Sequence, residues 1–221
     1  IFLDSSDLNA IKEFEPKVDG FTTNPTLMRK AGVTDYEKFC KEVLTLVKGK
    51  PVSFEVFADE FDEMERQARI ISSWGENVYV KIPITNTKGE SSVDLINKLT
   101  KDIKINVTAV TEYGQYKDVL PIQPLIVSIF AGRIADTGRD PRRFFEHDWG
   151  EHVIENVEYL WASPREVLNI YQAELIGADI ITCTPELLEK YEKFKRMDLN
   201  VLSLMTVKMF YNDAKEAGFK L

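Results

Sequence analysis

Short apolar segments alternate with amphipathic segments eight times along this chain of 221 residues. The apolar segments favour strands, and the amphipathic segments repeat their apolar residues with the 3.6-residue period of a helix. The expected strands are 1–4, 20–23, 52–57, 78–82, 103–109, 125–129, 157–162 and 179–183. Eight alternating strands and helices close into a parallel (β/α)8 barrel. We therefore predict an α/β fold, a single (β/α)8 TIM barrel domain over residues 1–221 with an extra C-terminal helix.

Boundary signals support the expected helices. Thr34-Asp35-Tyr36-Glu37 and Ser163-Pro164-Arg165-Glu166 have the pattern of capping boxes, the second with proline at the first helical position. Residues 131–141 are predicted to form a loop, followed by a helix of poorly defined limits that runs towards Asn156. The last helix, from about Val201 to Ala217, has an apolar stripe that could cover the barrel or pack on a neighbouring subunit.

Composition limits the partners of this chain. The content of 44% apolar and 29% charged residues is that of a soluble globular protein, and the net charge of −8 argues against nucleic acid or an acidic membrane as the main partner. No apolar run is long enough to span a membrane, and the start lacks the basic region of a signal peptide, so we expect a cytoplasmic protein. Because the first residue is not Met, we expect that a residue or two precede Ile1.

Few residues in the sequence suggest a metal site. Cys40 and Cys183 have no metal-binding spacing, and we interpret them as small core residues. His147 and His152 lie five residues apart beside acidic residues, which is compatible with a metal pair but also with a solvated helix face, the interpretation we prefer. We therefore predict no metal site from these residues.

One lysine lies inside an apolar strand. Lys81 is flanked by Val78-Tyr79-Val80 and Ile82-Pro83-Ile84, and lysine is seldom buried without a partner. It is either an ordinary lysine at an edge or strand end, or an amine with a chemical use. Desolvation disfavours the charged form of a buried amine, and a neutral amine can form a Schiff base with a carbonyl substrate.

Polar residues gather at the predicted carboxyl ends of the strands, where barrel enzymes place their active sites. They are Asp4, Asn24, Glu55, Lys81, Asn106, Thr108, Ser128, Arg133, Ser163 and Arg165. Core packing does not account for so many polar residues on so many strands. Their convergence on Lys81 favours the chemical interpretation of that lysine.

These residue types suit a Schiff-base aldol reaction on a phosphorylated sugar. Asp4 can take the proton of the hydroxyl whose carbon leaves, while Glu55 and Thr108 could hold a water that shuttles protons. Sugar hydroxyls can be bound by the set Asn24, Asn106 and Ser128. The planar guanidinium groups of Arg133 and Arg165 suit a phosphate. Ser163, at a predicted helix start, could add an anion-binding site.

Several motifs resemble the transaldolase family. They are Leu3-Asp4-Ser5-Ser6, Thr22-Thr23-Asn24-Pro25-Thr26, Lys81-Ile82-Pro83, Asn106-Val107-Thr108 and Ala162-Ser163-Pro164-Arg165. They follow the family order and span nearly the whole chain. The resemblance implies that Lys81 forms the Schiff base, Asp4 is the acid/base and Glu55 with Thr108 handles water. It also implies that Arg133, Ser163 and Arg165 bind phosphate.

The short chain is similar to the compact subfamily of small transaldolases and fructose-6-phosphate aldolases. The aldolase branch carries Gln and Tyr where this chain has Glu55 and Phe130, and transaldolases carry Glu and Phe. A tyrosine hydroxyl could help protonate or hydrate the bound intermediate, and phenylalanine cannot. The resemblance therefore implies transfer of a dihydroxyacetone unit between sugar phosphates in the pentose phosphate pathway, with no metal and no organic cofactor. It also implies a homo-oligomer, with a ring-shaped decamer as the candidate.

Three alternatives stay open at this point. The chain could be a fructose-6-phosphate aldolase, another Schiff-base aldolase such as a deoxyribose-phosphate aldolase, or a non-catalytic barrel that binds sugar phosphates. Two departures from the family pattern are Ile129, where proline is common, and residues 142–156, which are unlike the usual regular helix. Neither changes a residue to which the resemblance assigns a catalytic role.

Overall fold

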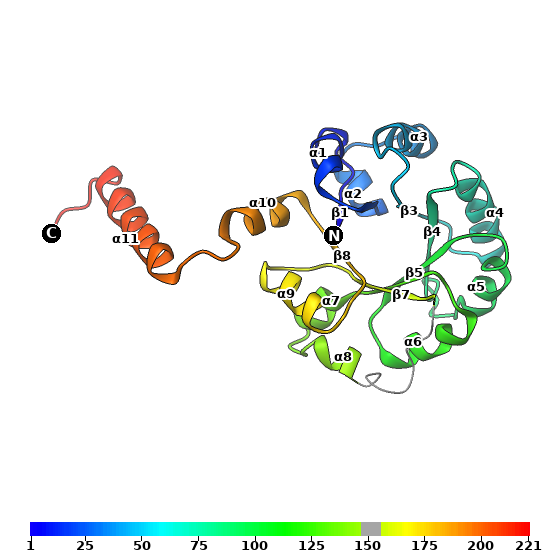
Figure 1. Ribbon diagram of the computed structural model, residues 1–221. Coiled ribbons are helices and arrows are strands. Elements are labelled where there is room, and N and C mark those ends of the chain that lie inside the picture. Colours follow the sequence, from blue (N-terminus) through cyan, green and yellow to red (C-terminus); the bar gives the residue numbers. More distant parts are fainter. Residues whose placement is uncertain (147–155) are drawn as a thin grey trace.

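The computed structural model describes residues 1–146 and 156–221 and contains a closed barrel of eight parallel strands (Figure 1). The strands are β1 (Phe2–Asp4), β2 (Gly20–Thr22), β3 (Val52–Glu55), β4 (Val78–Pro83), β5 (Ile105–Val110), β6 (Ile126–Ile129), β7 (Glu158–Trp161) and β8 (Ile180–Cys183). Each strand pairs with the next in the sequence, and β1 pairs with β8 through Phe2 and Thr182. The predicted (β/α)8 barrel is therefore confirmed.

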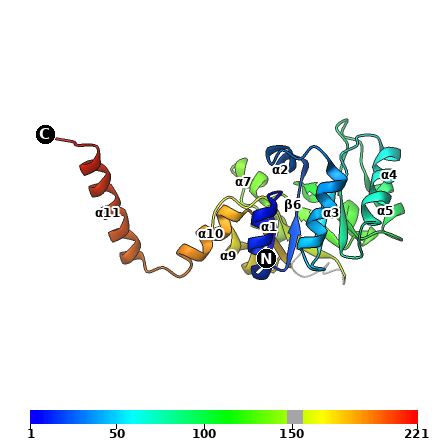
Figure 2. The same ribbon diagram turned by 90° about the horizontal axis from the view of Figure 1, so that it is seen from above.

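Helices connect and surround the strands. They are α1 (Leu8–Phe14), α2 (Pro25–Lys30), α3 (Tyr36–Leu46), α4 (Phe61–Ser72), α5 (Val93–Leu99), α6 (Tyr113–Val119), α7 (Ala131–Asp136), α8 (Arg142–Glu146), α9 (Leu168–Leu175), α10 (Pro185–Phe194) and α11 (Leu199–Glu216), with short 3-10 turns at Glu15–Lys17 and Leu120–Ile122. Figure 2 shows that the short helices α2 and α7 lie at one end of the barrel, opposite the N-terminus. Among the described residues, no helix has the length and apolarity needed to cross a membrane.

Apolar side chains fill two regions of the barrel. The larger core lies between the strands and the helices and includes both Cys40 and Cys183, which are fully buried, as predicted. A smaller cluster contains Phe2 together with Ile126, Leu160, Ala162 and Ile180. The ring of Phe2 lies where a side chain on Gly20 would clash, at 2.5 Å from the ideal Cβ position. The missing side chain at position 20 therefore leaves room for Phe2.

Three local predictions need correction. The helix after residue 34 is capped by Asp35, whose side chain accepts a hydrogen bond from the Lys38 N–H, so Thr34 is not the cap. The predicted strand 52–57 ends at Glu55. The predicted loop 131–141 contains α7. The helix predicted after this loop is present as α8, which is described over Arg142–Glu146. His147 and His152, and the rest of the segment towards Asn156, lie outside the described residues.

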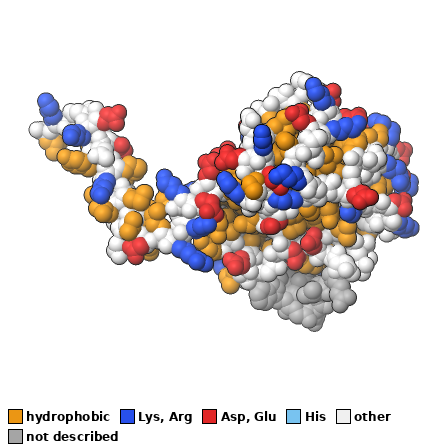
Figure 3. All heavy atoms as spheres, turned by 45° about the horizontal axis from the view of Figure 1, so that its top comes forward, with side chains coloured by type: hydrophobic (Ala, Val, Ile, Leu, Met, Phe, Trp, Pro, Cys, Tyr) orange, Lys and Arg blue, Asp and Glu red, His pale blue; other side chains and the backbone are white. Residues whose placement is uncertain are grey.

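The C-terminal helix extends away from the barrel. In Figures 1 and 2, α11 lies at the end of an arm beyond α10. None of its side chains is buried, and Leu204, Val207 and Phe210 are exposed. Figure 3 shows apolar side chains on the visible face of this arm. The alternative in which this helix covers the barrel of its own chain is therefore wrong.

Candidate active site

A cavity of about 420 Å³ lies among the carboxyl ends of the strands and their following loops. Its walls include nine of the predicted site residues, which are Asp4, Asn24, Glu55, Lys81, Ser128, Phe130, Arg133, Ser163 and Arg165. Asn106 and Thr108 are the two predicted residues that do not line it. Residues from most strands thus meet around one space, as in the barrel architecture in which each strand end contributes to the site.

Lys81 is buried in the wall of this cavity. It lies inside β4 and opposite Glu55 of β3, and its exposed fraction is 6%. Lys81 Nζ lies 3.2 Å from Glu55 Oε2 and donates a hydrogen bond of 3.1 Å to the backbone carbonyl of Thr23. A closed barrel has no edge strand, so the interpretation of Lys81 as an edge lysine is wrong. The carboxylate is close enough to take a proton from the ammonium group.

Asp4 is the second carboxylate near Lys81. Burial raises the pKa of Asp4, while the charge of Lys81 and a hydrogen bond from Thr22 oppose this rise. Thr22 Oγ1 donates to Asp4 Oδ1 at 2.7 Å and lies 2.6 Å from Thr182 Oγ1. A carboxyl whose pKa is raised by burial accepts a proton more readily than an exposed aspartate and can return it in a later step.

The sequence reasoning missed two threonines of this site. Thr22 and Thr182 both line the cavity from strands β2 and β8. Each is a polar residue in a strand whose other residues are apolar or glycine, and this signal could have identified them. Thr22 is the first threonine of the Thr-Thr-Asn-Pro motif, which carries the family resemblance but predicts no role for this threonine.

Asn106 and Thr108 lie on β5, behind the cavity wall. The Asn106 amide donates to Ser53 Oγ at 3.1 Å and accepts from Ser128 Oγ at 2.7 Å. Among the described residues, the buried Thr108 hydroxyl has no hydrogen-bond partner. The register between β5 and β6 shifts between Val107 and Val110, directly beside Thr108. Such a bulge can redirect a side chain, and the free hydroxyl of Thr108 could bind a water.

Asn24 has a structural role in addition to its place in the cavity wall. Its side-chain oxygen accepts a hydrogen bond from the Leu27 N–H and caps α2, a helix that the sequence reasoning did not predict. The side-chain NH₂ of Asn24 has no hydrogen-bond partner among the described residues. This amide can therefore donate to a ligand hydroxyl while its oxygen caps the helix.

Three residues at one side of the cavity could bind a phosphate. Arg133 lies on α7, and Ser163 and Arg165 lie in the loop between β7 and α9. The prediction that Ser163 to Glu166 form a capping box is wrong, because α9 begins at Leu168. Instead, Asn169 Oδ1 accepts hydrogen bonds from the backbone N–H groups of Arg165 and Glu166 and holds this segment as a loop. The anion-binding helix start predicted at Ser163 is therefore absent.

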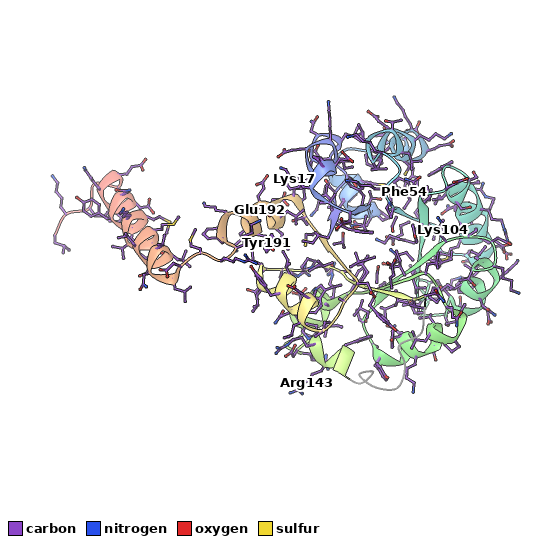
Figure 4. All side chains as sticks on the ribbon, in the orientation of Figure 1. Lys17, Phe54, Lys104, Arg143, Tyr191 and Glu192 are labelled. Atoms are coloured by element: carbon purple, nitrogen blue, oxygen red, sulfur yellow. The ribbon has the colours of Figure 1, made fainter. Side chains whose placement is uncertain are left out.

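A larger cavity of about 1070 Å³ lies elsewhere, between the loop after β5 and helices α7 and α8. It shares Arg133 with the site but contains neither Lys81 nor a carboxylate near an amine. In Figure 4, Arg143 from this region lies at the periphery of the molecule, whereas the buried Phe54 lies in the core between the strands and the helices. The residues expected to carry the chemistry therefore line the smaller cavity. Within residues 1–146 and 156–221, no three metal-binding side chains gather in a metal site.

Known proteins resemble this chain over most of its length. A "Probable transaldolase" of Methanococcus maripaludis is 36% identical over 86% of this chain and 87% of its own. Proteins of the same name from Thermoplasma volcanium, at 35% identity, and Brucella anthropi, at 32%, cover 90% and 89% of this chain and 90% of their own lengths.

A solved structure of a mandelate oxidase variant shares the fold. Its TM-score is 0.59 at 9% sequence identity, over 84% of this chain and 63% of its own. Residues 1–221 also match the family description "Transaldolase/Fructose-6-phosphate aldolase". Together with the relatives that are a third identical over most of their length, this match shows that the chain is an enzyme of the transaldolase and fructose-6-phosphate aldolase family.

Proposed function

We propose that this protein is a transaldolase that transfers a dihydroxyacetone unit between sugar phosphates through a Schiff base on Lys81. Its donors are fructose 6-phosphate or sedoheptulose 7-phosphate, and its acceptors are erythrose 4-phosphate or glyceraldehyde 3-phosphate. The observation that carries the proposal is the buried Lys81 amine, which lies 3.2 Å from the Glu55 carboxylate in a cavity that also contains Asp4. Two arginines lie in the wall of the same cavity.

Schiff-base formation begins when Lys81 gives up a proton. Glu55 accepts this proton, and the neutral amine attacks the ketone carbon of the donor. The resulting carbinolamine loses its hydroxyl as water after Glu55 returns a proton, directly or through a water held by Thr108. The product is an iminium ion between Lys81 and the sugar.

Carbon–carbon cleavage follows at the iminium. Asp4 removes the proton from the hydroxyl on the carbon that leaves, and the bond between that carbon and the three-carbon unit breaks. The electron pair of this bond moves to the iminium and gives a neutral enamine on Lys81. The remainder of a fructose 6-phosphate donor leaves as glyceraldehyde 3-phosphate.

Transfer reverses these steps with another aldehyde. The enamine attacks the carbonyl of erythrose 4-phosphate, and Asp4 returns its proton to the new hydroxyl group. Water then hydrolyses the iminium and releases sedoheptulose 7-phosphate. Phe130 supports transfer over hydrolysis because it brings a ring without a hydroxyl to the cavity wall. Among the described residues that line the cavity, none is a tyrosine whose phenol could supply the proton for early release.

Borohydride trapping tests the proposal. The protein is incubated with fructose 6-phosphate and reduced, with and without erythrose 4-phosphate, and its peptides are analysed by mass spectrometry. We expect a three-carbon adduct on Lys81 that diminishes when the acceptor aldehyde is present. Absence of any adduct would refute the Schiff-base mechanism and favour a binding barrel. Release of free dihydroxyacetone at the rate of cleavage would indicate a fructose-6-phosphate aldolase.

The surface of α11 supports a further part of the proposal, self-association. Its exposed Leu204, Val207 and Phe210 have no cover within the described part of the chain. We propose a homo-oligomer, with the decamer implied by the sequence resemblance as its candidate size. Sedimentation of the wild type and of a Val207→Lys variant tests this, because a charge at an apolar contact should reduce the mass of the assembly.

A further inference from the structure

Arg165 has two edges that can donate hydrogen bonds, and one of them is occupied. Its Nε donates to Asp136 Oδ1 at 3.2 Å and its Nη2 to Asp136 Oδ2 at 2.5 Å. This is a side-on fork, which leaves the end of the guanidinium, formed by Nη1 and the second hydrogen of Nη2, unused. In the described part of the chain, Nη1 has no hydrogen-bond partner. Arg165 can therefore bind Asp136 and an oxyanion at the same time.

Asp136 is exposed and lies outside the cavity wall. Arg133 and Arg165 line the cavity, whereas Asp136 is not among its lining residues. The hydrogen bonds from Arg165, followed by the charges of Arg165 and Arg133, lower the pKa of Asp136. This carboxylate therefore stays charged at neutral pH, where a sugar phosphate is also charged. Two arginines and one aspartate leave a net positive group for the ligand.

A second contact joins the same two segments. Gly132, next to Arg133 in α7, packs so closely on the loop that its N–H lies 3.3 Å from the Ala162 carbonyl oxygen. The loop itself is held by Asn169, which accepts from the backbone N–H of Arg165. The backbone of Arg165 is thus fixed, and its long side chain is the remaining flexible part. Asp136 restricts that side chain.

We propose that Asp136 is a positioning residue that determines specificity for phosphorylated substrates. It holds the side edge of Arg165 so that the end edge is ready to bind the phosphate of the sugar. An arginine that is already ordered loses less conformational freedom when the phosphate binds. The inference rests on the proposed function, because it assigns the anion in this site to a sugar phosphate.

A carboxylate that contacts an arginine can also have the opposite effect and weaken phosphate binding. A carboxylate that occupied the end edge would compete with the phosphate, and its removal would strengthen binding. The side-on geometry of Asp136 leaves the end edge free, so the structure favours support over competition. The two roles predict opposite signs for the same substitution.

The test compares Asp136→Asn with Glu63→Gln. Glu63 binds Arg66 through the same side-on fork, with Nε at 2.8 Å and Nη2 at 2.6 Å. This pair is also exposed, but it lies on α4 and does not line the cavity. For both variants, kcat and KM are measured with fructose 6-phosphate and with unphosphorylated fructose. Binding of inorganic phosphate is measured by calorimetry, which requires no turnover.

We expect Asp136→Asn to raise the KM for fructose 6-phosphate and the Kd for inorganic phosphate by about 3- to 10-fold, the factor for ordering one long side chain. The kcat/KM for fructose should stay unchanged, and Glu63→Gln should match the wild type throughout. In an Arg165→Ala background, Asp136→Asn should cause no further loss, because its effect passes through Arg165.

Other outcomes would overturn the inference. Tighter phosphate binding by Asp136→Asn would show competition, and equal losses with both sugars would show a general structural effect. An unchanged phosphate Kd would exclude the positioning role. If the wild type bound phosphate but formed no Lys81 adduct, the proposed function would fail while the role of Asp136 in anion binding could still be measured.

Discussion

Replacement of Gly132 by alanine should separate two parts of the proposed phosphate site. A Cβ at this position would lie 1.6 Å from the Ser163 carbonyl oxygen and 3.2 Å from the Ser163 Cβ. Real Cβ contacts are essentially never shorter than 3.0 Å, so the two backbones must move apart by about 1.4 Å, the difference from 1.6 Å. No side-chain rotation relieves this clash, because the oxygen belongs to the backbone.

The movement would affect both stability and substrate binding. Overpacking of this kind costs about 1–3 kcal/mol, which corresponds to a fall in Tm of about 3–10 °C for a protein of this size. Gly132 precedes Arg133, and Ser163 lies in the loop of Arg165. A misplacement of about 1 Å can reduce activity by about 100-fold, so we expect kcat/KM for fructose 6-phosphate to fall by at least about 10-fold.

Thermal melting and steady-state kinetics measure these effects, and Gly75→Ala is the matched control. A Cβ on Gly75 would meet the Asn77 side-chain oxygen at 2.9 Å, and a flexible side chain can move away. We therefore expect Gly75→Ala to remain close to the wild type. A Gly132→Ala variant that kept the wild-type Tm and kcat/KM would refute the close packing of α7 on the loop after β7.

Four further changes have defined outcomes. Lys81→Met should abolish the borohydride adduct and lower kcat by more than about 10⁴-fold, because no other group replaces the nucleophile. Asp4→Asn should also inactivate the enzyme yet raise its Tm at pH 7. Burial raises the pKa of Asp4 above its unfolded value, so the stability that this group contributes at low pH is lost as the pH rises through the folded pKa. Thr22→Val should shift the acidic limb of kcat/KM to higher pH, because the hydrogen bond from Thr22 lowers the pKa of Asp4. Phe54→Ala should cost about 3–5 kcal/mol in denaturant unfolding, since it empties a fully buried site.

Each of these expectations has an outcome that would contradict it. An adduct on the Lys81→Met protein would place the Schiff base elsewhere. A lower Tm of Asp4→Asn at pH 7 would mean that the charged carboxylate stabilises the fold. An unchanged pH profile of Thr22→Val would show that this hydroxyl does not affect the base. A small loss in Phe54→Ala would indicate that the barrel can collapse around the missing ring.

Features that depend on local patterns were predictable from the sequence. The strand of Lys81 and the alternation of strands and helices follow from the spacing of apolar residues, and this spacing led to the closed barrel. Because parallel strands in a barrel all end at one face, Asp4, Glu55 and Lys81 could be placed together without coordinates. The motif resemblance then added the expected chemistry of these residues.

Tertiary contacts decided the rest. Ser163-Pro164-Arg165-Glu166 has the pattern of a helix start, but the side chain of Asn169 binds the backbone and keeps this segment as a loop. The apolar stripe of the last helix was visible in the sequence, and only the structure shows that α11 leaves its own barrel.

The partners of individual side chains also required the structure. Asp136 lies 29 residues from Arg165 in the chain and contacts it only because α7 and the loop after β7 fold together. The same holds for the pair Thr22 and Thr182, which the closure of the barrel brings to 2.6 Å. Sequence periodicity specifies which face a residue occupies, because that depends on the residues next to it. It does not specify which distant side chain lies opposite, because that depends on how the whole barrel closes.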